Sequence, residues 1–146
     1  EKTTFAEWEV QWLIEMEEMG FSVNYLPKRN KTVCFTVQEN NELIDPYGSV
    51  FSCSEVSLVP SYVKDGKNIH SLGTLEDAPL KHSNSPWANF YSDSVLSQYG
   101  CWNCPMLPTC GGSCPKEWGE GRIPCPSTKY NIEQRMLLAY VKSLKN

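Results

Sequence analysis

The chain has 146 residues, with 17 acidic and 13 basic side chains and a formal net charge of −4 at pH 7. Nucleic-acid-binding domains usually present a basic patch, and the basic run at 28–31 is short enough to be a solvated turn. No apolar run approaches the roughly 20 residues that span a bilayer, so we expect neither a nucleic-acid nor a membrane partner.

A helix is predicted near the N-terminus. Thr4 and Glu7 have the spacing of a capping box, and Gly20 is placed to end the helix. An apolar stripe at helical spacing predicts a packed helix face. The stripe consists of Trp8, Trp12, Met16 and Met19.

Short strands are predicted to follow. Apolar residues alternate over 21–25 and again over 33–37, which is typical of strands. Residues 43–53 are predicted to form a hairpin, because Asp-Pro-Tyr-Gly at 45–48 suits a type I turn.

The second half of the chain predicts more loop than regular structure. Residues 58–87 are rich in polar and turn residues, and a helix is expected at 87–99. Asn131 and Gln134 are spaced to begin a C-terminal helix, which we expect to pack on the cysteine-rich region. Its apolar side would be formed by Ile132, Met136, Leu137, Tyr140, Val141 and Leu144.

Seven cysteines form a single pattern, and none falls outside it. The spacing is C-x13-G-x4-C, a gap, C-x2-C-x5-C-x3-C, a second gap and a last cysteine. Such density indicates metal or disulfide chemistry. The residues are Cys34, Cys53, Cys101, Cys104, Cys110, Cys114 and Cys125.

Three chemistries compete for these thiols. Disulfides are disfavoured by the odd number, the dense run and the lack of a visible signal peptide. Two all-cysteine zinc sites need eight ligands, and only His70 and His82 are available to complete the set. Iron-sulfur clusters fit better, because they tolerate a missing protein ligand.

The residues beside the cysteines favour iron-sulfur chemistry. Proline follows Cys104, Cys114 and Cys125, where the chain must turn away. Gly111 and Gly112 let main chain approach an inorganic core that a Cβ would obstruct. Amides in such turns can donate hydrogen bonds to sulfur.

The cysteine frame resembles the SPASM domain, the C-terminal auxiliary-cluster module of radical SAM enzymes that mature peptides and proteins. Every element of that family's pattern is met from Cys34 to Cys125, and residues 45–53 and 69–75 also resemble family stretches. The resemblance implies an α+β fold. We expect an irregular, loop-rich domain at 31–146 with a β-hairpin, cluster-binding loops and a C-terminal helix. Residues 1–30 would be the last α/β piece of a partial TIM-like barrel, the radical SAM core.

The resemblance also implies a ligand assignment for two 4Fe-4S clusters. The first auxiliary cluster would take Cys34, Cys53 and Cys114. The second cluster would take Cys101, Cys104, Cys110 and Cys125. Some family members close the first site with an upstream cysteine, and none precedes Cys34 here, so we expect an open iron or a non-cysteine ligand.

The C-x3-C-x2-C loop that binds the SAM-cleaving cluster is absent, so no catalytic residue is expected in this chain. The resemblance implies a fragment of a longer enzyme whose missing N-terminal part holds S-adenosylmethionine and a third cluster. The parent would oxidatively modify a ribosomally made peptide or protein and exchange electrons with a redox protein. Thiols that await iron imply a reducing cytoplasm.

Three other interpretations stay open. The domain could be a structural or peptide-recognition module, or a separate electron-transfer protein. It could also bind zinc, particularly in an aerobically prepared fragment.

Overall fold

The computed structural model describes residues 1–30, 33–39, 41–77, 85–92 and 95–144. It combines helices with small antiparallel sheets, which confirms the predicted α+β class. The chain divides into two compact units, and each is described by itself. The division between residues 30 and 31 stays a prediction.

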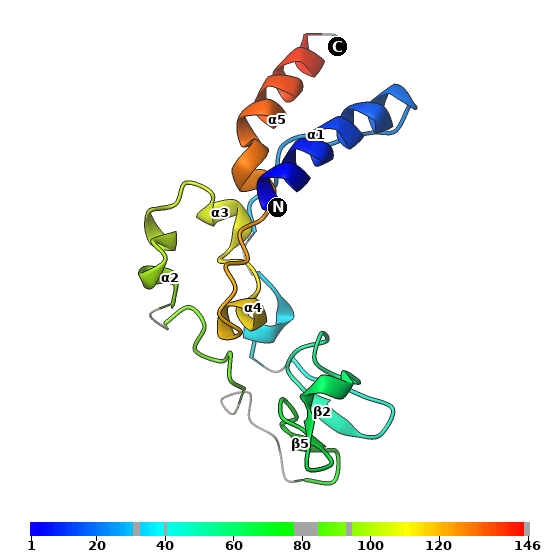
Figure 1. Cartoon of the computed structure of the whole chain (residues 1–146), viewed down its shortest axis with the longest axis vertical. Helices are drawn as coiled ribbons and strands as arrows, with labels where there is room; N and C mark the ends of the chain where they lie inside the picture. Colours follow the sequence, from blue (N-terminus) through cyan, green and yellow to red (C-terminus); the bar gives the residue numbers. More distant parts are fainter. Residues whose placement is uncertain (31–32, 40, 78–84, 93–94, 145–146) are drawn as a thin grey trace. The chain divides into compact units, whose positions relative to one another are not determined.

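The first unit comprises Glu1–Lys31, Cys104–Ser113 and Pro124–Asn146. Its helices are α1 (Lys2–Glu18), α3 (Leu107–Cys110) and α5 (Thr128–Ser143). The helices α1 and α5 pack against each other, and Figure 1 shows them side by side.

The second unit comprises Thr32–Asn103 and Cys114–Ile123. One sheet has the order β1-β2-β5, with both pairs antiparallel, and a second sheet pairs β3 with β4. The strands are β1 (Leu43–Ile44), β2 (Ser49–Phe51), β3 (Val63–Lys64), β4 (Lys67–Asn68) and β5 (Gly73–Thr74). The helices are η1 (Phe35–Val37), η2 (Pro60–Tyr62), α2 (Val95–Gln98), η4 (Cys101–Asn103) and α4 (Pro115–Gly119).

The predicted hairpin is present between β1 and β2 (Figure 1). A carboxylate oxygen of Asp45 accepts hydrogen bonds from the amides of Tyr47 and Ser49, each at 2.9 Å. Gly48 donates its amide to the Asp45 carbonyl at 3.0 Å and has φ +79°, a conformation that favours glycine. These turn contacts therefore fix the pairing register of β1 and β2, and the chain reaches Cys53 shortly after β2.

Two apolar clusters form the core of the second unit. One contains Phe51, Cys53, Val56 and Trp87, and the other contains Phe90, Leu96 and Trp118. A candidate ligand, Cys53, is thus itself a core residue at 5% exposure.

The first unit is held by a buried polar network. The Arg135 guanidinium lies 2.9 Å from a Glu9 carboxylate oxygen and donates to the Tyr25 carbonyl at 3.0 Å. Asn131 donates to the Ala6 carbonyl at 2.8 Å and accepts from Arg135 Nε at 2.9 Å. The network joins α1, α5 and the segment that follows α1.

The N-terminal helix is confirmed, but two predicted details are wrong. The helix begins at Lys2, so Glu1 rather than Thr4 occupies the N-cap, and no side-chain capping bond forms. The expected packed stripe is exposed, from 44% at Met16 to 72% at Met19. Periodicity identified a face of α1, but α5 packs on the face that contains Ala6 and Glu9.

Two predicted strands are wrong. Residues 21–25 form no strand, although Val23 and Tyr25 are buried as alternation suggested. Residues 35–37 form the 3-10 helix η1. At both places a local pattern of apolar residues lacked a neighbouring strand to supply the ladder hydrogen bonds.

The predicted later helices are partly right. Of 87–99, Val95–Gln98 is helical and the described residues 87–92 form turns, while 93–94 lie outside the described residues. The C-terminal helix begins at Thr128, so Asn131 lies inside it with a non-helical φ of −125°. Its expected apolar side is largely exposed, and the side packed on α1 carries Asn131 and Arg135. Among the described residues no helix is both long and apolar enough to cross a bilayer.

Candidate metal centres

All seven cysteines belong to the described residues, and the structure records each as a thiol. Cys53 is buried, and the other six are half-buried. Partial exposure near loops lets thiols receive a metal centre.

Three of the cysteines gather in the second unit. Burial raises the pKa of the Cys53 thiol, and Cys34 and Cys114 raise it further because their sulfurs are close enough for like charges to repel. Hydrogen bonds from the Glu55 amide and the Thr36 side chain act in the opposite direction. Cys34, Cys53 and Cys114 are the three that the sequence pattern assigns to the first cluster.

The three cysteines lie next to different elements. Cys34 is extended, with φ −165°, and immediately precedes η1. Cys53 closely follows β2. Cys114 is the N-cap residue of α4, and Pro115 occupies the first turn of that helix, where a missing amide costs nothing. The hairpin and the two short helices thus bring together residues that are 80 positions apart in sequence.

Thr36 makes two contacts with one of the three sulfurs. Its amide donates to Cys34 Sγ at 3.3 Å, and the Cys34 thiol lies 3.1 Å from Thr36 Oγ1. The Thr36 side chain also lowers the pKa of Cys53. Thr36 is only 1% exposed.

Three more cysteines belong to the first unit: Cys104, Cys110 and Cys125. Cys110 ends α3, and Gly111, Gly112 and Ser113 then take left-handed conformations in succession. This sharp turn lets the Gly112 amide donate to Cys110 Sγ at 3.4 Å. The predicted role of the glycine pair, approach of main chain to an inorganic core, stays a prediction, and the contact is consistent with the expectation that amides in such turns donate to sulfur.

The turn after Cys110 is tied to the segment that carries Cys125. Ser113 Oγ donates to the carbonyl of Pro124, the residue before Cys125. Ser113 has φ +62°, which is costly for a residue with a Cβ, so this bond helps to hold an unfavourable backbone.

Lys129 lies beside Cys125, in the first turn of α5. Its ammonium nitrogen is 3.6 Å from Cys125 Sγ. Cys125, and to a smaller degree Cys104, raises the pKa of Lys129 because a thiolate stabilises the nearby cation. Cys104 and Cys125 therefore both act on one positive charge.

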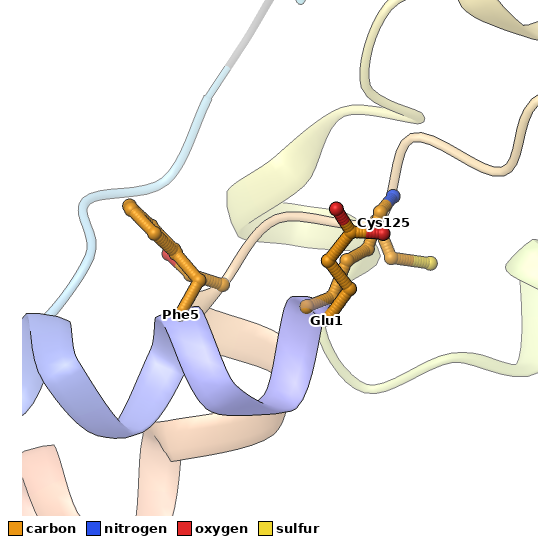
Figure 2. Close-up of a pocket in the computed structure, with 5 residues that line it drawn as sticks. Glu1, Phe5 and Cys125 are labelled. Atoms are coloured by element: carbon orange, nitrogen blue, oxygen red, sulfur yellow. The ribbon is translucent and has the colours of Figure 1, made fainter.

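A cavity of about 440 Å³ borders Cys125. Figure 2 shows Glu1 at the start of α1 and Phe5 within it, with Cys125 on the adjoining segment. Lys2 and Ser127 complete the lining. The second candidate centre thus has open space next to one of its sulfurs.

Cys101, the fourth predicted ligand of the second cluster, lies in η4 and belongs to the second unit. It packs against the apolar cluster of Phe90, Leu96 and Trp118. The boundary between the units falls inside the C-x2-C pair.

The described side chains do not form a site for a single metal ion. Within the described part of the chain, no three His, Cys, Asp or Glu residues converge on one ion. A tetrahedral zinc site with Zn–S bonds of about 2.3 Å needs sulfurs roughly 3.8 Å apart. The sulfurs that hold a four-iron cluster are bound to different irons, so they need not lie as close together as the ligands of one zinc ion.

The described histidine does not support a zinc site. His70 stacks on Trp87 with ring centroids 5.4 Å apart and meets the Tyr62 ring edge-on at 4.7 Å. Burial lowers its pKa. The other histidine, His82, lies outside the described residues.

No family model, curated protein or solved structure matches this chain. The candidate centres therefore depend on the cysteine pattern and on the geometry above.

The sequence reasoning did not identify Thr36, Lys129 or Ser113. A hydroxyl two residues from Cys34, and a lysine one helical turn beyond Cys125, are the signals that could have indicated the first two. Such neighbours are common around any cysteine, so the pattern alone does not single them out.

Proposed function

We propose that the chain is a SPASM-type auxiliary domain that holds two 4Fe-4S clusters for the oxidative maturation of a ribosomally made peptide. The observation that carries the proposal is that Cys34 and Cys114 are both near enough to buried Cys53 to raise the pKa of its thiol. The spacing pattern selected these three residues as one ligand set, and two of them are separated from the third by more than 60 positions.

The donors around the sulfurs suit thiolate ligands. Amides of Thr36, Glu55 and Gly112 and the ammonium of Lys129 are directed at sulfur atoms. Hydrogen bonds and positive charge stabilise the negative charge of a thiolate and help to set the reduction potential. A bound cluster supplies one-electron transfer. The chain's own residues hold the sulfurs, exclude water around Cys53 and offer the cavity beside Cys125.

The second ligand set, Cys101, Cys104, Cys110 and Cys125, has partial support. Cys104 and Cys125 share the Lys129 charge, and Ser113 ties the Cys110 turn to the Cys125 segment. Cys101 enters the proposal through the sequence pattern alone.

The wider assignments belong to the same proposal. Residues 1–30 would end the barrel of a radical SAM core, and the S-adenosylmethionine chemistry would reside in that core. The partners would be a precursor peptide or protein and a redox protein, in a reducing cytoplasm. In this proposal residues 1–146 supply three cysteine ligands to the first cluster.

A structural module is the second candidate function, and one observation favours it. Cys53 is part of the apolar core with Phe51, Val56 and Trp87, so a centre bound there would add directly to folding stability. In that case the clusters would hold the domain in shape for peptide recognition, without exchanging electrons during turnover.

Anaerobic reconstitution with iron and sulfide tests the proposal. We expect about eight iron and eight sulfide per chain, since each cluster contains four of each. Cys53→Ala and Cys125→Ala should each lose about half of both, because alanine cannot ligate iron and each change removes one site. Each variant is the matched control for the other.

The two candidate functions differ in redox behaviour. Reversible one-electron reduction of both clusters supports electron transfer, and clusters that resist reduction support the structural module. Stoichiometric zinc with no iron after reconstitution would contradict both cluster-based functions.

A further inference from the structure

A pocket of about 250 Å³ lies within the second unit, beside α4. Trp87, Phe90 and Trp118 form the aromatic part of its wall, and each is at most 7% exposed. The other described residues of the wall are uncharged: Pro86, Val95, Pro115 and Gly119. Pockets for drug-sized ligands usually measure roughly 300–1,000 Å³, so this one suits a single large apolar side chain.

The two indoles of the wall already take part in ring contacts. Trp87 stacks on His70, with centroids 5.4 Å apart and 23° between the ring planes. Trp118 packs on Tyr99 at 4.7 Å with a tilt of 37°. An aromatic ring in the pocket extends this set of contacts, whereas an aliphatic group of the same size fills the space without the ring–ring attraction.

The pocket adjoins residues that hold two candidate ligands. Pro115 lines the pocket and directly follows Cys114, the N-cap residue of α4. Cys101 packs against the apolar cluster to which Phe90 and Trp118 belong. A side chain bound in the pocket therefore contacts the residues next to Cys114 and Cys101.

We propose that this pocket binds the aromatic side chain of a peptide segment. The pocket and its preference for a ring rest on the wall residues, while assigning the segment to the precursor peptide rests on the proposed function above. The pocket binds and orients the segment beside the cysteine-bearing loops, and no bond is formed or broken in it.

Two matched probes test the preference for an aromatic ring on the wild-type reconstituted protein. N-acetyl-phenylalaninamide and N-acetyl-cyclohexylalaninamide have rings of similar size, but only the first ring is aromatic. We expect a dissociation constant on the order of 1 mM for the phenyl probe, which is ordinary for so small a ligand. The cyclohexyl probe should bind about threefold to tenfold more weakly, because it lacks the ring–ring attraction. N-acetyl-alaninamide should bind at least about tenfold more weakly, because it leaves the pocket unfilled. The measurement is an NMR titration that follows the indole N–H signals of Trp87 and Trp118.

Two variants at Gly119 test the location of the site. A Cβ at Gly119 would meet Trp87 Nε1 at 3.5 Å, an ordinary contact, so Gly119→Ala should keep the affinity within about twofold. Gly119→Leu places a longer side chain in the same wall and should weaken binding of the phenyl probe by at least about tenfold, because it takes up the space.

Each outcome decides one part of the proposal. Equal or tighter binding of the cyclohexyl probe overturns the aromatic preference. Unchanged affinity in Gly119→Leu, or Trp87 and Trp118 signals that do not respond to the phenyl probe, overturns the pocket. If Gly119→Leu does not fold, the wild-type titrations decide. Iron analysis of the same sample separates the two proposals: probe binding without iron overturns the cluster assignment alone, and iron without probe binding overturns the pocket alone.

Discussion

The two compact units surround their cysteines with different chemistry. In the second unit, Cys53 is buried in an apolar core, and the groups that lower its pKa, the Thr36 side chain and the Glu55 amide, are neutral. In the first unit, Cys125 is half-buried beside a cavity and next to the Lys129 ammonium. The thiols of the two units thus differ in whether neutral dipoles or a full charge lies next to them.

The units also differ in what holds them together. The second unit has two apolar clusters, whereas the first buries the polar residues Asn131 and Arg135 beside apolar ones such as Val23. A polar core is sensitive to the loss of one member, because the remaining groups are left without partners in a medium of low polarity.

Arg135→Met should have the largest effect, a loss of about 3 kcal/mol in the free energy of unfolding. The change removes the positive charge beside the Glu9 carboxylate, which keeps only Asn131 and Ser127 as neutral donors, and it removes the Arg135 donor to the Tyr25 carbonyl. Arg122→Met is the control, since its guanidinium is 55% exposed and should cost less than about 0.5 kcal/mol. Urea unfolding of the metal-free protein, followed by circular dichroism, measures both. Equal losses would show that the polar network does not hold the first unit.

Lys129→Met tests the charge at the second site. Removing a cation destabilises the reduced cluster, so we expect the equilibrium constant for its reduction to fall by about threefold to tenfold. The effect should weaken in high salt, because Lys129 is exposed and screened. The measurement is a dithionite titration of the reconstituted protein, followed by electron paramagnetic resonance. A Cys53→Ala background is used so that only the second site contributes to the signal.

Two control variants test whether the charge of Lys129 causes the shift. Lys129→Arg keeps the positive charge and should restore most of the potential. Lys64→Met removes an exposed lysine from β3 and should have no effect. If Lys64→Met and Lys129→Met shift the reduction potential equally, the position of Lys129 beside Cys125 has no special effect on the second site.

The turn at 45–48 was predictable because Asp45, Pro46 and Gly48 determine it through local chemistry. The ligand set Cys34, Cys53 and Cys114 stays a prediction of the spacing pattern, and the effect of Cys34 and Cys114 on the pKa of Cys53 is consistent with it. The exposure of the apolar stripe of α1 could not be predicted, because periodicity identifies a helical face but not the element that packs on it. The polar packing of α5 was missed because Asn131 and Arg135 are residue types expected at the surface.

Acidification should have the smallest of these effects, and it should destabilise the two units at different pH values. Burial lowers the pKa of His70 from 6.5, so its neutral form belongs to the folded state and its contribution is present above pH 6.5 and lost as pH falls below it. Burial alone would raise the pKa of Glu9, but hydrogen bonds from Ser127, Asn131 and Arg135 lower it overall from 4.5. The contribution of Glu9 is therefore complete above pH 4.5 and is lost as pH falls below that value.

We expect amide hydrogen exchange to show the second unit loosening first as pH falls below 6.5, and the first unit only below pH 4.5. His70→Gln should remove the earlier step, and Glu9→Gln should remove the later one, at the cost of some stability at neutral pH. If His70→Gln leaves the earlier step unchanged, the stacked His70–Trp87 pair does not couple protonation to the stability of the second unit. If both units loosen together at one pH, their cores do not respond independently to charge.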